Sequence, residues 1–221
     1  ELFQKLWTNY TFDQYLKDRI NRYRKRIKIN NLKKIIKGKK VIDFGCGHGN
    51  FLIAALMEGS SFGYGIDFGK ESIIYANKMK NKLKFNNKLD FKVASVYKTK
   101  IKSNSFDVAI QNGVFHHIDK PKMAYKELHR VLKKDGYAWF YTDGGGGIRD
   151  ITTDMSQKIL KDINISYKIN KIRSLNLSYK KIYHLSDNIN AKYQHYDLKS
   201  YIKYLEKIGF RNFTQLNGGT S

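Results

Sequence analysis

Short runs rich in β-branched and aromatic residues alternate with helix-like segments through the middle of this chain. The predicted strands are residues 39–44, 61–67, 89–95, 105–112 and 137–143. The helices predicted between them are residues 50–59, residues 70–83 and a third from Pro121 to about Gly136. Such a chain folds as a parallel sheet with helices on both faces and ligands at the carboxyl ends of the strands. The sequence therefore predicts an α/β fold with a doubly wound, mainly parallel sheet.

Other segments flank this alternating core. Thr11-Phe-Asp-Gln14 has the spacing of a capping box, and a basic helix is predicted from there to about Ile36. Residues 144–190 are long, polar and irregularly helical, which is too much for a simple connection. A last helix is predicted at 197–209 and a sixth strand at 210–216.

The length of 221 residues, with 41% hydrophobic residues, suits one domain with a sizeable core. We divide that domain into a helical N-terminal lid (1–38), a core (39–143), an inserted cap (144–196) and a final helix and strand (197–221). The four-glycine run at 144–147 would give the cap a mobile hinge, because each glycine is conformationally free.

Charge and cysteine content narrow the function classes. The net charge of +23 raises the question of nucleic-acid binding. Lysine, asparagine and isoleucine are abundant together, however, and no aromatic–basic RNA signature accompanies the basic run at 22–28. We favour solvated lysine faces, with an anionic substrate or a membrane surface still open. Cys46 is the one cysteine and no apolar run approaches a membrane span of about 18 residues, so a cytoplasmic location is expected.

The stretch VIDFGCGHGN at 41–50 has a glycine at every second position: Gly45, Gly47 and Gly49. Glycine accepts positive φ and lets a ligand approach the bare backbone. The turn follows a strand and opens a helix, so its amides attract negative charge. A dinucleotide fingerprint, G-x-G-x-x-G, would need glycine where Asn50 stands. The spacing therefore disfavours a nicotinamide-dependent oxidoreductase.

Asp67 ends the second predicted strand and is placed to accept hydrogen bonds from both hydroxyls of a ribose. VIDFGCGHGNFLIAAL, GYGIDFGKESIIYAN and SFDVAIQNGVFHHIDKPKMAYKELHRVLKKDGYAWFY resemble successive motifs of class I S-adenosylmethionine-dependent methyltransferases. They are most similar to the small-molecule branch with ubiquinone/menaquinone-type enzymes, over roughly residues 39–142. The resemblance implies a Rossmann-like fold, S-adenosylmethionine as methyl donor, S-adenosylhomocysteine as product, and a small-molecule acceptor methylated on oxygen or nitrogen.

The resemblance also implies which residues bind the methionine end of the cofactor. Asp43 and the backbone amides around Gly45, Cys46 and Gly47 would line it, and Gly49 would let the next helix pack close.

Further cofactor contacts follow from the same resemblance. Asp67 would bind the ribose and Phe68 would cover the adenine ring. Where related sequences carry Gly-Asp-Ala after the third strand, this chain has Ala-Ser-Val, so Ser95 and the Val96 amide are the expected adenine contacts. Gln111 would line the methionine side near the sulfonium.

Two more groups would complete the cofactor site. Asn112 would stand beside Gln111 on the methionine side. Trp7, Tyr10 and Phe12 either form a cofactor lid or pack the first helix on the sheet, and the sequence leaves both readings open.

Methyl transfer depends mainly on alignment, which is worth about 7–11 kcal/mol, and a base adds roughly two to four orders of magnitude. His116 and His117, at the end of the fourth strand, are base candidates that cannot both face a ligand, and we favour His116. His195 is a second candidate, and Tyr141 and Asp143 end the fifth strand on the ligand side. A purely local hydrogen-bonding role for the histidines is an equal alternative.

Rival functions remain open. An RNA-directed methyltransferase is disfavoured because QNGVFHH at 111–117 lacks an Asn/Asp-Pro-Pro-aromatic motif. A non-catalytic S-adenosylmethionine-binding protein is the other alternative. No metal site is predicted, because the histidines have no ligand spacing with carboxylates or with Cys46. Only Asn217 and GGTS follow the sixth predicted strand, too short for the final antiparallel strand of this fold, so we expect the native chain to continue past Ser221.

Overall fold

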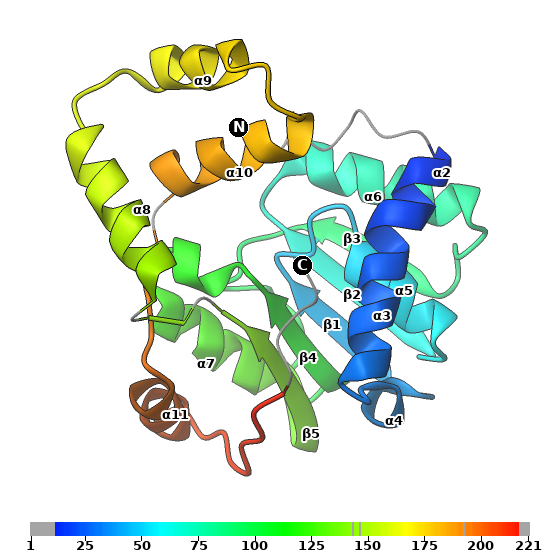
Figure 1. The fold of residues 1–221 in the computed structure, drawn as a ribbon. Coiled ribbons are helices and arrows are strands. Elements are labelled where there is room, and N and C mark those ends of the chain that lie inside the picture. Colours follow the sequence, from blue (N-terminus) through cyan, green and yellow to red (C-terminus); the bar gives the residue numbers. More distant parts are fainter. Residues whose placement is uncertain (1–11, 143, 146, 192, 217–221) are drawn as a thin grey trace.

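A parallel sheet forms the centre of the structure, a computed structural model that describes residues 12–142, 144–145, 147–191 and 193–216 (Figure 1). Its strands are β1 (Lys40–Phe44), β2 (Phe62–Asp67), β3 (Leu89–Val93), β4 (Phe106–Asn112) and β5 (Leu132–Tyr141). They lie in the order β3-β2-β1-β4-β5, and each neighbouring pair is parallel. The predicted doubly wound α/β fold is confirmed, with the reversal of strand order between β1 and β4.

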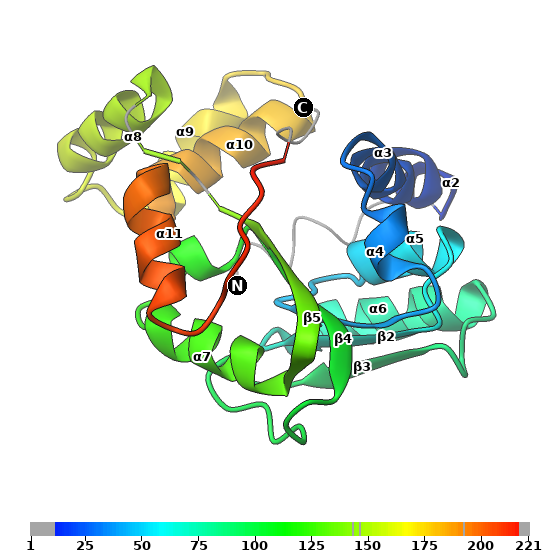
Figure 2. The ribbon, with the colours of Figure 1, turned by 90° about the horizontal axis from the view of Figure 1, so that it is seen from below.

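Helices cover both faces of the sheet (Figure 2). The helices on one face are α2 (Phe12–Gln14), η1 (Tyr15–Ile20), α3 (Asn21–Ile29), α4 (Lys33–Ile36), α5 (Asn50–Met57) and α6 (Lys70–Lys82). The helices on the other face are α7 (Pro121–Val131) and α11 (Leu198–Glu206). A short 3-10 turn, η2 (Phe115–His117), follows β4. The predicted insertion folds as α8 (Ile148–Ile159), α9 (Ile165–Ser174) and α10 (Tyr179–Asn190), on the carboxyl-end side of the sheet (Figure 1).

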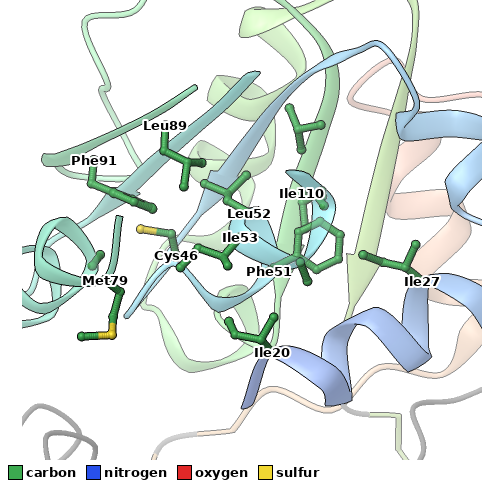
Figure 3. Close-up of a cluster of buried hydrophobic side chains, with 14 of the residues drawn as sticks. Ile20, Ile27, Cys46, Phe51, Leu52, Ile53, Met79, Leu89, Phe91 and Ile110 are labelled. Carbon is green, nitrogen blue, oxygen red and sulfur yellow. The ribbon is translucent and has the colours of Figure 1, made fainter. Parts of the chain in front are cut away.

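The core consists of two clusters, one on each face of the sheet. Side chains alternate along β1, so Val41 enters the first cluster while Ile42 enters the second. Figure 3 shows Ile20 and Ile27 of the N-terminal helices beside Phe51 of α5 in the first cluster. Because these isoleucines are fully buried, the N-terminal helices are part of the domain core.

The predicted basic helix is interrupted. A π-helical turn, η1, precedes α3, and Asn31 adopts a positive φ of 54° between α3 and α4. Asparagine tolerates this left-handed backbone, so it ends one helix before the next begins. No helix within the described ranges is long and apolar enough to cross a membrane.

The predicted end of the helix after β4 is wrong. α7 ends at Val131, and β5 begins at Leu132 instead of residue 137. The register with β4 shifts in this region, and Asp135 adopts a φ of 61°. A Cβ on Gly136 would lie 2.9 Å from the Asp107 carbonyl oxygen. Gly136 therefore allows close approach of β5 to β4 in an irregular stretch and does not cap a helix.

The predicted sixth strand is also wrong, because residues 210–216 form no strand. Asn212 adopts a φ of 56°, which interrupts an extended backbone. Just before it, the Arg211 Nη1 group donates to the carbonyl oxygens of Glu206 and Phe210. The segment instead runs as a coil next to β5 (Figure 2) and is anchored by Phe210, which is buried in the second cluster.

Candidate active site

The glycine turn between β1 and α5 is fixed to the neighbouring strand. The amides of Gly45 and Cys46 both donate to the Ile66 carbonyl oxygen, at 2.8 and 2.9 Å. Gly45, Gly47 and Gly49 all have positive φ, at 80°, 51° and 73°. The Cys46 side chain points into the first cluster (Figure 3), so only its backbone is available to a ligand.

The three glycines differ in what surrounds them. A Cβ on Gly45 would overlap Val114 at 2.6 Å, and a Cβ on Gly49 would overlap Phe91 at 2.4 Å. A Cβ on Gly47 would meet no atom within 4 Å. Packing therefore requires glycine at the first and third positions, whereas the space beside Gly47 is open to a ligand.

Asp67, the last residue of β2, faces this turn. Its Oδ2 accepts from the Gly47 amide and its Oδ1 from the Gly69 amide, both at 2.8 Å. Burial raises the pKa of Asp67, and these two backbone hydrogen bonds partly offset the rise. Each carboxylate oxygen has a further lone pair, so Asp67 can still accept hydrogen bonds from a ligand. The next side chain, Phe68, is 81% exposed and packs on no core element.

Asp43 on β1 is buried, and its Oδ1 has no hydrogen-bond partner among the described residues. Burial raises its pKa to about 8, with a further contribution from the charge of Asp67. A buried acceptor without a partner is costly, and a cationic ligand group would relieve that cost. The residue thus suits the ammonium group of an amino-acid moiety.

The predicted adenine contacts follow β3 directly. The Ala94 amide donates to the Asp67 carbonyl oxygen at 2.9 Å, so the end of β3 lies beside Asp67. Ser95 Oγ accepts from the Tyr97 amide at 3.2 Å, while Val96 packs against the second cluster. The structure therefore brings Ser95 and Val96 to the same sheet edge as Asp67.

The Gln111 side chain is hydrogen-bonded to neighbouring residues of the protein. It is fully buried, its Oε1 accepts from the amides of Val114 and Phe115, and its Nε2 donates to the Tyr141 carbonyl oxygen. Its side chain therefore shapes the turn after β4. The neighbouring Asn112 holds the N-terminal helices, because its Oδ1 accepts from Arg26 Nη1 at 2.9 Å.

The candidate bases are gathered in one aromatic stack. The His116 ring stacks on Tyr193 at 5.9 Å, and Tyr193 stacks on His195 at 5.8 Å. The His117 ring packs edge-on against the same tyrosine at 4.7 Å. His116 Nδ1 also lies 3.3 Å from Thr142 Oγ1. All three histidines predicted from sequence are thus brought together at the ends of β4 and β5.

His195 differs from the other two histidines in its surroundings. Its Nδ1 lies 3.7 Å from Asp150 Oδ1 and its Nε2 lies 3.9 Å from Asp154 Oδ1, both on α8. Both ring nitrogens are buried, and neither has a hydrogen-bond partner within the described ranges. The carboxylates of Asp150 and Asp154 therefore flank the His195 ring.

The N-terminal helices contact the glycine turn. Tyr15 Oη donates to the His48 carbonyl oxygen at 2.9 Å. Burial, followed by the charge of Arg19, lowers the pKa of His48 to about 4. Of the predicted lid aromatics, Phe12 is partly buried against the first cluster. The other two, Trp7 and Tyr10, lie outside the described residues, as does Asp143.

Sequence reasoning missed Tyr15, His48, Arg26 and Tyr193. A signal existed for Arg26, because helical spacing places it one turn after Tyr23 and beside Ile27 on the inner face of α3. None of the other three had a distinguishing pattern.

Residues 35–189 match the family described as "Methyltransferase domain". That match covers most of the chain, which therefore belongs to this methyltransferase family. Ubiquinone biosynthesis O-methyltransferase of Pelagibacter ubique is 34% identical over 131 residues, 58% of this chain and 51% of that protein. The ubiquinone/menaquinone biosynthesis C-methyltransferase of Geotalea uraniireducens is 29% identical over 142 residues, 62% of this chain and 60% of that protein. The chain thus spans roughly half the length of the curated relatives it matches.

Solved structures share the fold. A protein of Methanococcus maripaludis, classed as an S-adenosylmethionine-dependent methyltransferase, aligns with a TM-score of 0.62 at 19% identity and covers 99% of this chain and 90% of its own. One from Bacillus halodurans, classed as a methyltransferase, aligns with a TM-score of 0.58 at 16% identity, over 83% of this chain and 67% of its own. The predicted Rossmann-like methyltransferase fold is confirmed.

Proposed function

We propose that this protein transfers a methyl group from S-adenosylmethionine to an oxygen or nitrogen atom of a small-molecule acceptor. The observation that carries the proposal is the pairing of Gly47 with Asp67. The open, left-handed glycine lies at a helix N-terminus, and its amide is bonded to an acid that ends the neighbouring strand. This arrangement supports binding of a ribose next to a close backbone approach.

The residues present fit the cofactor. The unpartnered Oδ1 of Asp43 suits its ammonium group, and the oriented carboxylate of Asp67 suits its ribose hydroxyls. Phe68, Ser95 and Val96 would hold the adenine, with Phe68 exposed enough to cover it. Bound S-adenosylmethionine supplies an activated methyl group, so the chain's own task is to orient the acceptor, exclude water and accept a proton.

His195 is our choice for the base when the acceptor atom carries a proton. Its ring nitrogens make no hydrogen bond to any residue that the structure describes, and Asp150 and Asp154 would stabilise the imidazolium that forms. Its stack with Tyr193 would hold the ring in place, whereas His116 is engaged with Thr142. The cap at 144–196 would then cover the acceptor.

The choice of a small-molecule acceptor draws on the relatives named for ubiquinone biosynthesis. We also propose that the acceptor is anionic and that the protein is located in the cytoplasm. The RNA-directed and the non-catalytic alternatives are separated from it by experiment.

A transfer assay with methyl-labelled S-adenosylmethionine tests the function. The protein is incubated with small hydroxylated and amino compounds, and separately with total RNA. We expect label in a small molecule, and label in RNA alone would contradict the proposal. Binding of S-adenosylhomocysteine with no transfer to any acceptor would favour the non-catalytic alternative.

A further inference from the structure

Arg26 of α3 is a buried cation with no counter-ion in the part of the chain that the structure describes. Its side chain is buried, with 6% of the residue exposed. Among the residues that the structure describes, no Asp or Glu forms an ion pair with it. Arg24, two residues earlier on the same helix and partly exposed, is paired with Glu58 at 2.8 Å. An unpaired buried charge is costly to retain, so Arg26 needs an explanation that Arg24 does not.

The contacts of Arg26 orient its guanidinium without neutralising it. Nη1 donates to Asn112 Oδ1 at 2.9 Å, and the guanidinium carbon lies 4.5 Å from the centre of the Tyr141 ring. A neutral amide and an aromatic face are the contacts that hold an arginine in place while its charge stays available. Nε is buried and donates to no atom of the residues that the structure describes. The guanidinium of Arg26 therefore has at least one N–H that could donate to a ligand.

Arg26 lies at the carboxyl ends of β4 and β5, the edge of the sheet where this fold binds its ligands. Asn112 is the last residue of β4 and Tyr141 the last residue of β5. The two strand ends are joined because the Gly113 amide donates to the Tyr141 carbonyl oxygen at 2.8 Å. β4 in turn pairs with β1, which leads into the glycine turn.

We infer that Arg26 binds the carboxylate of a small ligand at this edge. A planar guanidinium matches a carboxylate through paired N–H donors, which a lysine cannot reproduce. Two carboxylates are available under the proposed function, on which this inference rests: that of the cofactor's methionine end and that of an acidic acceptor. If the carboxylate is that of the cofactor, Asp43 on β1 would bind the ammonium group of the same methionine end.

The test uses pairs of ligands that differ by one carboxylate. Calorimetry compares S-adenosylmethionine with its decarboxylated form, and then benzoate with benzamide in the presence of saturating S-adenosylhomocysteine. The proteins are the wild type, Arg26→Met, Arg26→Lys and the exposed charge-matched control Arg22→Met. Arg26→Met should remove a preference of about 10- to 100-fold for the carboxylate in one of the two pairs, the scale of hydrogen bonds to a charged group.

The outcomes distinguish a carboxylate of the cofactor from a carboxylate of the acceptor. Loss of preference in the S-adenosyl pair assigns the cofactor carboxylate, and loss in the benzoate pair assigns the acceptor. Arg26→Lys should retain only part of the preference, and Arg22→Met all of it. Unchanged preferences in Arg26→Met, with a lowered melting temperature, would overturn the inference and leave Arg26 a structural residue. If Arg26→Met does not fold, full preferences in Arg26→Lys would overturn it as well. A wild type that binds neither S-adenosyl compound would contradict the proposed function itself.

Discussion

The Gly47 amide donates a 2.8 Å hydrogen bond to Oδ2 of Asp67 and so joins the turn after β1 to the last residue of β2. A second bond, from the Gly69 amide to Oδ1, fixes the other carboxylate oxygen. The carboxylate is therefore oriented before a ligand arrives, which lowers the ordering cost of binding. These two bonds hold the turn after β1 and the Asp67 carboxylate in a fixed relative position.

The glycines of the turn should respond differently to substitution by alanine. Gly49→Ala places a Cβ 2.4 Å from Phe91 and should destabilise the fold strongly, by overlap added to backbone strain. Gly47→Ala meets no atom within 4 Å and should cost only the strain of a left-handed residue, about 1–2 kcal/mol. Urea denaturation measures both values. Equal losses of stability would show that Gly47 is also held by packing.

A larger side chain at the second glycine extends this test to function. Gly47→Trp should leave unfolding cooperative while abolishing binding of S-adenosylhomocysteine, because the indole would occupy the open space. Full affinity in this variant would exclude that space from the cofactor site.

Asp43 should make stability depend on pH. Its pKa is raised by burial to about 8 in the folded protein, against an ordinary value of 3.8. The folded state then binds the proton more tightly, so this contribution is present at acid pH and lost as pH rises from about 4 through 8. Asp43→Asn should therefore gain stability relative to the wild type at pH 8 compared with pH 5, by a few kcal/mol at most. Denaturation at both values checks this, and a pH-independent difference would contradict it.

His195 should affect chemistry more than cofactor binding. His195→Gln should lower kcat by about 100-fold, within the range for loss of a general base, and leave the affinity for S-adenosylhomocysteine unchanged. His117→Gln is the matched control, because His117 packs on the same tyrosine, whereas Asp150 and Asp154 flank the His195 ring. An equal loss in both variants would indicate that the stack acts only as a structural unit.

The cap should close over the bound ligands. We expect the amides of α8, α9 and α10 to become better protected from hydrogen exchange when S-adenosylhomocysteine and the acceptor found in the transfer assay are both bound. The glycine stretch at 144–147 would serve as the hinge. Equal protection with and without ligands would make this segment a fixed wall of the site.

The strands and the order of motifs could be predicted because they depend on local pattern. Apolar residues alternate within short segments, and the glycine turn and the acid that ends the second strand are also short-range features. The end of α7 could not be found in this way. Gly136 looks like a helix cap in sequence, and only its contact with Asp107 on the neighbouring strand shows that it lies in a strand irregularity.

The candidate site shows the same division. Asp43 and Asp67 were accessible from sequence because they end or lie in strands next to the turn. The roles of Gln111 and Arg26 were not accessible, since they depend on contacts with segments distant in the chain. The sixth predicted strand failed for a related reason, because Asn212 adopts a left-handed backbone and Arg211 donates to the carbonyl oxygens of Glu206 and Phe210.

The most direct test of a methyl-donor site is calorimetric titration of S-adenosylhomocysteine and of NAD into the wild type and Asp67→Ala. We expect the wild type to bind S-adenosylhomocysteine and to give no response to NAD. Asp67→Ala, folded by circular dichroism, should lose about 1–3 kcal/mol of binding free energy. No binding of S-adenosylhomocysteine by the wild type, or the same affinity in Asp67→Ala, would contradict it.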